Sequence, residues 1–436
     1  MKAAKSKKAR RLERMQNLTI LLLTLSALAL FVNLPLFGPL ADSSLLELAR
    51  VRLSREHTAS ASAVSGAVSF TFPVRMVYTN DFTRLGTDAL TTLSDEFERA
   101  GPYLGEAVGS AYDRQSVGEF VFLSALRGEG LYFDFPVAMP SEILAALLNV
   151  TMPEAEVRSI RRVLLTPGRD QDALLYLEDG AGAHYRFSTA VNSEALSDFL
   201  SSRSGSSADF AYMLGPDYSE LSPYTLILSE PSPRSTLSVS NALSGNEDAF
   251  LRRAEFNPHT ENRFTESTGT TIVREVSSTL YLRADGTLDY QGGEAAPGSI
   301  YRVPAAKPNE PTLVEAAGAA QKLAIGLLQD SLGEAALYLS GIASSAGTYE
   351  ITFDLMIDGT PLRFSDGSHA VSITVRGQNI TAFTCKARRY ALNESVPLLL
   401  PFAQAVAIAR AWDSAELLVA YVDAGGDTVS PTWIAE

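Results

Sequence analysis

The feature that most constrains this chain is an uncharged, mostly apolar run of 27 residues from Met15 to Ala41. A helix over Asn17–Phe37 would be about 31 Å long at ~1.5 Å per residue, which matches a bilayer hydrocarbon core of ~30 Å. Pro35 and Pro39 lie at its outer end, where a helix can stop without leaving backbone groups unpaired in lipid. Because no second uncharged apolar run reaches ~18 residues, the sequence predicts a single transmembrane helix.

A cleaved signal peptide is the alternative interpretation of this run. Signal peptides have an apolar region of ~7–15 residues followed by a small-x-small cleavage site. Here the run is longer, and the nearest candidate site, Pro39-Leu40-Ala41, has proline at its first position. We therefore favour an uncleaved signal anchor.

Charge is distributed unevenly on either side of this run. Seven basic residues and Glu13 alone give the first fourteen residues a net charge of +6, which leaves −20 on the rest of a chain whose total is −14. The positive-inside rule then predicts a cytoplasmic N-terminus and an extracytoplasmic body in the cell membrane. Because of the predicted anchor, we expect the lipid bilayer as a partner. An acidic body repels the phosphates of DNA and RNA, so we expect no nucleic acid as a partner.

The sequence divides into five predicted segments. Residues 1–14 form the basic stub, 15–41 the anchor, and 42–65 a stalk rich in small and polar residues. Two extracytoplasmic domains follow, at 66–245 and 246–436.

Both predicted domains combine strands and helices. Asp285-Gly286 and Asp358-Gly359 interrupt alternating apolar patterns, as hairpin turns do. The other predicted strands lie at 67–78, 130–136, 160–165, 173–177, 184–187, 370–375, 380–385, 417–422 and 432–435. Helical spacing lies at 87–99, 140–148 (with Ser141 as the cap), 192–200, 312–332 and 401–412. The fold class is therefore α+β, with antiparallel sheets, packed helices and two predicted subdomains.

Catalytic motifs are missing from the sequence. There is no phosphate-binding P-loop, no GxSxG elbow and no HExxH, and the four histidines are scattered. The single cysteine, Cys385, excludes an intramolecular disulfide and a multi-cysteine zinc site. We therefore assign no catalytic, cofactor-binding or metal-binding residue, although a dispersed Ser-His-Asp triad stays open.

The densest polar stretch is Glu255–Glu266. His259, Glu261 and Glu266 have the side chains of a metal or proton-transfer site. An exposed loop begun by Asn-Pro, with solvated charges, is the simpler interpretation, and a recognition loop is a third. We take Asn257, His259, Glu261 and Arg263 as candidate interaction residues.

Two further candidates lie in the predicted anchor. Ser26 and Ala29 are small residues three positions apart on one helical face. Such a pair permits close approach of another membrane helix, although chance placement toward lipid accounts for it equally well.

Beyond the anchor, three stretches resemble the YycH/YycI family. They are Phe256–Phe264, Gly347–Leu362 and the ending from Pro401 to Trp433. Members of this family are membrane-anchored accessory proteins of the cell-wall-sensing histidine kinase of Gram-positive bacteria. The resemblance implies a regulatory protein that contacts a membrane sensor histidine kinase and a related accessory protein, and it transfers no catalytic residue.

Two other classes of function stay open. One is an extracytoplasmic hydrolase of the cell envelope that uses dispersed carboxylates or a serine. The other is a structural component of the envelope or of the division machinery. A deep pocket with convergent titratable groups would favour the hydrolase.

Overall fold

The computed structural model describes residues 73–80, 83–87, 95–152, 157–169, 171–229, 231, 233–275, 277–292, 301–328, 331–409 and 416–436. These residues all belong to one compact unit, Ser62–Glu436. The predicted stub, anchor and stalk lie outside the described residues, and so do Ser26 and Ala29. Within the described ranges, no helix has the length and apolar character needed to span a bilayer.

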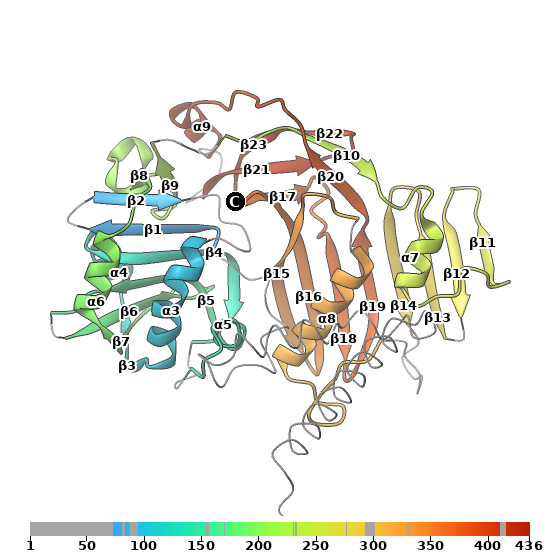
Figure 1. Ribbon diagram of the computed structural model, residues 1–436, viewed down its shortest axis with the longest axis horizontal. Coiled ribbons are helices and arrows are strands. Elements are labelled where there is room, and N and C mark those ends of the chain that lie inside the picture. Colours follow the sequence, from blue (N-terminus) through green and yellow to red (C-terminus); the bar gives the residue numbers. More distant parts are fainter. Residues whose placement is uncertain are drawn as a thin grey trace, which may run out of the picture. The chain divides into compact units, whose positions relative to one another are not determined.

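The first half of the described chain builds a nine-stranded antiparallel sheet in the order β3-β7-β6-β5-β4-β1-β2-β8-β9 (Figure 1). Its strands are β1 (Arg75–Asn80), β2 (Thr83–Thr87), β3 (Tyr112–Val117), β4 (Gly130–Pro140), β5 (Ser159–Thr166), β6 (Asp172–Glu178), β7 (His184–Asn192), β8 (Ser206–Phe210) and β9 (Leu226–Leu228). Its helices are α3 (Asp95–Gly109), α4 (Glu119–Arg127), α5 (Ser141–Leu148) and α6 (Ser193–Ser201), with short 3₁₀ turns at Ala211–Met213 and Pro216–Tyr218.

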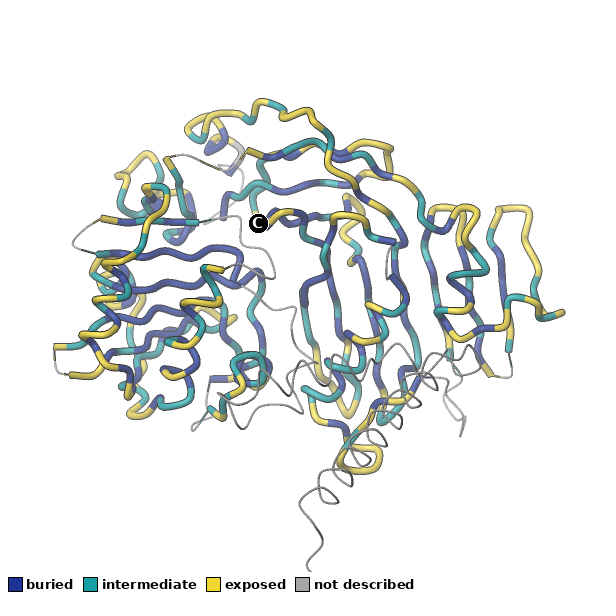
Figure 2. Tube along the Cα trace, viewed as in Figure 1, coloured by how far each residue is buried: buried dark blue, intermediate teal, exposed yellow. Residues whose placement is uncertain are grey.

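Helices cover both faces of this sheet. Leu131 and Phe133 of β4 pack in the same cluster as side chains of α3 and α6. Tyr132, between them, packs with Phe122 and Leu126 of α4. Successive side chains of a strand point to opposite faces, so both faces are buried, and Figure 2 shows the strands as largely buried.

The second half builds an eleven-stranded sheet in the order β11-β12-β13-β14-β19-β18-β16-β17-β21-β23, with β15 paired to β16. Its strands are β11 (Arg263–Thr265), β12 (Thr271–Glu275), β13 (Ser278–Leu282), β14 (Thr287–Gly292), β15 (Ala336–Ser345), β16 (Thr348–Ile357), β17 (Thr360–Phe364), β18 (Val371–Arg376), β19 (Asn379–Lys386), β21 (Leu417–Asp423) and β23 (Pro431–Ala435). The β17–β21 pair is parallel and the others are antiparallel.

A small third sheet and three helices complete the second half. The sheet has the order β20-β10-β22. Its strands are β10 (Leu237–Asn241), β20 (Arg388–Leu392) and β22 (Thr428–Val429), and the helices are α7 (Glu247–Arg253), α8 (Leu313–Leu328) and α9 (Phe402–Ala409).

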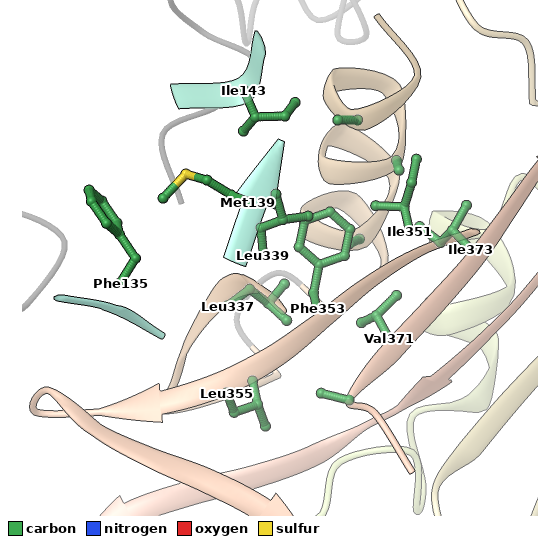
Figure 3. Close-up of a cluster of buried hydrophobic side chains, with 14 of the residues drawn as sticks. Phe135, Met139, Ile143, Leu337, Leu339, Ile351, Phe353, Leu355, Val371 and Ile373 are labelled. Atoms are coloured by element: carbon green, nitrogen blue, oxygen red, sulfur yellow. The ribbon is translucent and has the colours of Figure 1, made fainter. Parts of the chain in front are cut away.

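One hydrophobic cluster runs through both large sheets. Met139 of β4 and Ile143 of α5 lie beside Leu339 of β15 and Phe353 of β16 (Figure 3). The exposed fraction of each of these four side chains is 4% or less. The two halves of the described chain therefore share a core.

The predicted fold class, α+β with antiparallel sheets and several helices, is confirmed. Local turn chemistry was a reliable guide, because Gly286 and the Asp358-Gly359 pair have the positive φ angles that their tight turns require. Two details were wrong. Thr87, predicted to begin a helix, ends β2, while α3 begins at Asp95. Ser141 is the first residue of α5 rather than its cap, and Pro140 precedes it without a side-chain cap.

Candidate functional site

Arg263 links the polar loop predicted from sequence to α7. Its guanidinium donates to Glu247 and Asp248 of α7, each at 2.6 Å. The Asn257 side chain accepts from the backbone N–H of His259 at 3.0 Å, while the side chains of His259 and Glu261 are exposed. The four candidates therefore do not converge on one centre, and their role in recognition stays a prediction.

We expect Arg263→Ala to loosen this loop, because the ion pairs that fasten it to α7 would be lost. Hydrogen exchange measured on peptides covering 257–266 should become faster in this variant. Glu261→Ala is the matched control, since loss of this exposed side chain should change stability by no more than about 0.5 kcal/mol. Equal exchange in the two variants would contradict the structural role of Arg263.

A serine, a histidine and an aspartate do meet at another place. The Nδ1 atom of His369 lies 3.1 Å from Asp354 Oδ2 and 3.4 Å from Ser340 Oγ. In a catalytic triad the two ring nitrogens serve different partners, one the nucleophile and the other the carboxylate. Here both partners contact the same nitrogen, so the geometry does not favour a serine nucleophile activated by this histidine.

The densest constellation of charges is a buried ion cluster that the sequence did not reveal. In three neighbouring strand pairs, side chains of opposite charge stand directly across from each other: Arg75 with Asp134, Asp134 with Arg162, and Arg162 with Glu178. The row runs across β1, β4, β5 and β6 with alternating sign. Opposite charges at directly paired positions stabilise a sheet.

Glu416 connects this row to the start of β21. It accepts from Arg162 at 2.8 Å and pairs with Arg75. Arg161 adds a further cation, 3.5 Å from Glu416 and 3.6 Å from Asp134. Three arginines thus face three carboxylates, and the cluster, defined as Arg75, Asp134, Arg161, Arg162, Glu178 and Glu416, is electrically balanced. It fastens the nine-stranded sheet to the C-terminal strands.

Burial and charge act in opposite directions on Asp134, which is completely buried. Burial alone would raise the pKa of its carboxyl group, but Arg75, Arg161 and Arg162 together outweigh burial, so the pKa lies below its ordinary value. Asp134 is therefore ionised at neutral pH.

An apolar groove of about 280 Å³ opens beside this cluster. Four parts of the chain line it: β9, the residues around Thr360, the segment 399–402, and β21 with Trp433 of β23. Arg75, a member of the ion cluster, lines it as well, together with Arg234. Apolar walls with a few charged groups are typical of binding sites, so the arrangement favours binding of an apolar chain over chemistry.

No metal centre is found among the other side chains that the structure describes. Within the described ranges no group of three or more His, Cys, Asp or Glu side chains could hold a metal ion. Cys385 is buried, and burial raises the pKa of its thiol to about 12. The thiol is therefore protonated and unreactive at neutral pH.

Comparison with known proteins finds a solved structure with a similar fold. No protein-family model and no curated protein matches the chain. Among solved structures it is similar to the crystal structure of YycH from Bacillus subtilis, with a TM-score of 0.53 and 13% sequence identity over 86% of this chain and 95% of that chain. The chain has a YycH-like fold. At this identity the likeness concerns the fold alone, so the partner and the site must be argued separately.

Proposed function

We propose that this protein is a membrane-anchored, extracytoplasmic regulator that modulates a two-component sensor histidine kinase by protein–protein contact. The YycH-like fold is the observation that carries the proposal, because the likeness extends over most of both chains. The predicted anchor behind a basic N-terminus supports it. A related accessory protein is the second partner that we propose.

Regulation of this kind needs no catalysis. An effector shifts the equilibrium between two kinase states only by contacting one of them more favourably than the other. We propose that the contacts come from the membrane helix, through the face that carries Ser26 and Ala29, and from the surface of the exported body.

A kinase-dependent reporter in intact cells tests the proposal. Deletion of the protein should change reporter output by on the order of fivefold or more, the range of a typical coupling energy between two sites. Unchanged output would contradict the regulatory role.

The membrane contact has its own test in the same cells. The double variant Ser26→Leu/Ala29→Leu should reproduce much of the effect of deletion, because bulky side chains keep the helices apart. Ala27→Leu, on a different face of the same helix, is the matched control and should behave as wild type. If both variants behave as wild type, the contact does not lie on this face.

A further inference from the structure

The row of paired charges in the nine-stranded sheet continues one strand further, to a histidine. His184, the first residue of β7, stands directly across from Glu178 of β6 (Figure 1). His184 is only 5% exposed, and its ring lies against the ring of Phe122, with centroids 5.0 Å apart. Histidine is the side-chain type whose charge ordinarily changes between pH 5 and 8. The row therefore ends in a buried, titratable group.

Tyr224 connects this histidine to α4. Its hydroxyl lies 2.8 Å from Nε2 of His184 and 3.3 Å from Oε1 of Glu119, the first residue of α4. The guanidinium of Arg162 lies over the tyrosine ring, 4.3 Å from its centroid. The phenol is thus held between the histidine and the start of the helix.

The tyrosine hydroxyl has one proton and two groups that can accept it. Burial, followed by the charges of Glu178 and Glu119, raises the pKa of Tyr224 above its ordinary value, so the hydroxyl stays protonated at neutral and acidic pH. A hydroxyl donates one hydrogen bond. An unprotonated Nε2 of His184 can accept that bond. A protonated Nε2 instead donates to the tyrosine oxygen and leaves the tyrosine proton for Glu119.

The first turn of α4 has little else to hold it. Gly118 precedes the helix without a side-chain cap, and the first N–H groups of a helix lack partners inside it. Phe120 and Val121 follow Glu119 and are 83% and 41% exposed. The bond from Tyr224 to Glu119 is therefore a contact on which the order of this turn can depend.

Charged and titratable groups surround the histidine and its tyrosine partner. In the described part of the chain they are Glu178 and Tyr176 of β6, Glu119 of α4, Arg162 of β5 and Tyr132 of β4. On β3, Val117 is paired with His184. Arg162 donates to both carboxylate oxygens of Glu178, at 2.7 and 2.9 Å, so the charge of Glu178 is already balanced. Glu119 is the other carboxylate of this set.

We propose that His184, Tyr224 and Glu119 form a proton-dependent switch that orders the first turn of α4. A proton taken from solvent by Nε2 turns the tyrosine hydroxyl toward Glu119, and its loss turns the hydroxyl back toward His184. The carboxylate then loses its donor, and the turn that carries Phe120 and Val121 is released. Because hydrogen bonds to ionised groups are the stronger ones, acid should tighten this turn.

Hydrogen exchange of the full-length protein in detergent tests the switch. Protection of peptides covering 118–126, corrected for the intrinsic effect of pH on exchange, should rise about fivefold between about pH 7.5 and about pH 5.5. Tyr224→Phe keeps the ring beneath Arg162 but removes the hydroxyl, and should abolish the rise. His184→Gln cannot take up the proton and should abolish it too. His259→Gln, at an exposed histidine, is the matched control and should respond as wild type.

Three results would overturn the proposal: a wild type whose protection does not change with pH, a rise that survives in Tyr224→Phe or in His184→Gln, and an equal loss of the rise in His259→Gln. Tyr224→Phe decides the matter if circular dichroism shows that His184→Gln does not fold. Nitrogen NMR of labelled histidine adds a direct check, because neutral His184 should carry its proton on Nδ1, and a proton on Nε2 would contradict the switch. A failed switch with an intact kinase reporter would leave the proposed regulation standing.

Discussion

Asp134→Asn is expected to lower the free energy of unfolding by about 3–5 kcal/mol, the typical effect of removing one partner from a buried ion pair. The substitution keeps the size of the side chain but removes the charge that faces Arg75, Arg161 and Arg162. Urea denaturation at pH 7 measures the loss. Asp172→Asn, at an exposed position of β6, is the control and should change stability by no more than about 0.5 kcal/mol.

The charge of Asp134 should also affect how the stability of the protein depends on pH. Because the pKa of Asp134 is lower in the folded protein than its ordinary value of about 3.9, its charge stabilises the fold fully above that value. This contribution is lost as pH falls below about 4 and through the folded pKa. Stability of the wild type measured from pH 7 to pH 3 should therefore fall more steeply than that of Asp134→Asn. Parallel curves would show that Asp134 does not hold the cluster together.

Phe353→Ala is expected to lower the free energy of unfolding by about 3–5 kcal/mol, because it removes a large buried side chain and leaves a cavity. Phe353 is 1% exposed and belongs to the cluster that reaches from β16 to β4 and α5. A core shared in this way should unfold as one unit. Hydrogen exchange should therefore accelerate together in peptides from β4 and from β16.

The control for this second experiment is a substitution outside the shared core. Phe264→Ala changes a 46% exposed side chain on β11 and should leave exchange in β4 and β16 unchanged. If Phe353→Ala accelerates exchange in β16 while β4 stays protected, the two halves unfold separately, as the predicted boundary between residues 245 and 246 would require.

Sequence reasoning was most successful where structure depends on neighbours in the chain. The Asp285-Gly286 and Asp358-Gly359 turns could be predicted because only two residues decide them. The predicted helix 192–200 agrees with α6 for the same reason, since Asn192 Oδ1 accepts from Ala195 N–H at 2.9 Å.

The ion cluster and the groove could not be predicted in this way. Arg75, Asp134, Arg162 and Glu178 are far apart in the sequence, and only the register of four strands places them in one row. The apolar run Val396–Leu400 was visible in the sequence, but its exposure depends on what packs beside it. This run is the sequence signal that could have led to the groove, because Leu399 and Leu400 line it.

Chemical crosslinking in native membranes, followed by mass spectrometry, tests the central claim most directly. The intact protein should be recovered with a membrane sensor histidine kinase. A variant whose residues 15–41 are replaced by an unrelated membrane span should lose that kinase if the contact lies in the membrane, and should keep it if the contact lies on the exported body. Recovery of no kinase with the intact protein would contradict the proposed function.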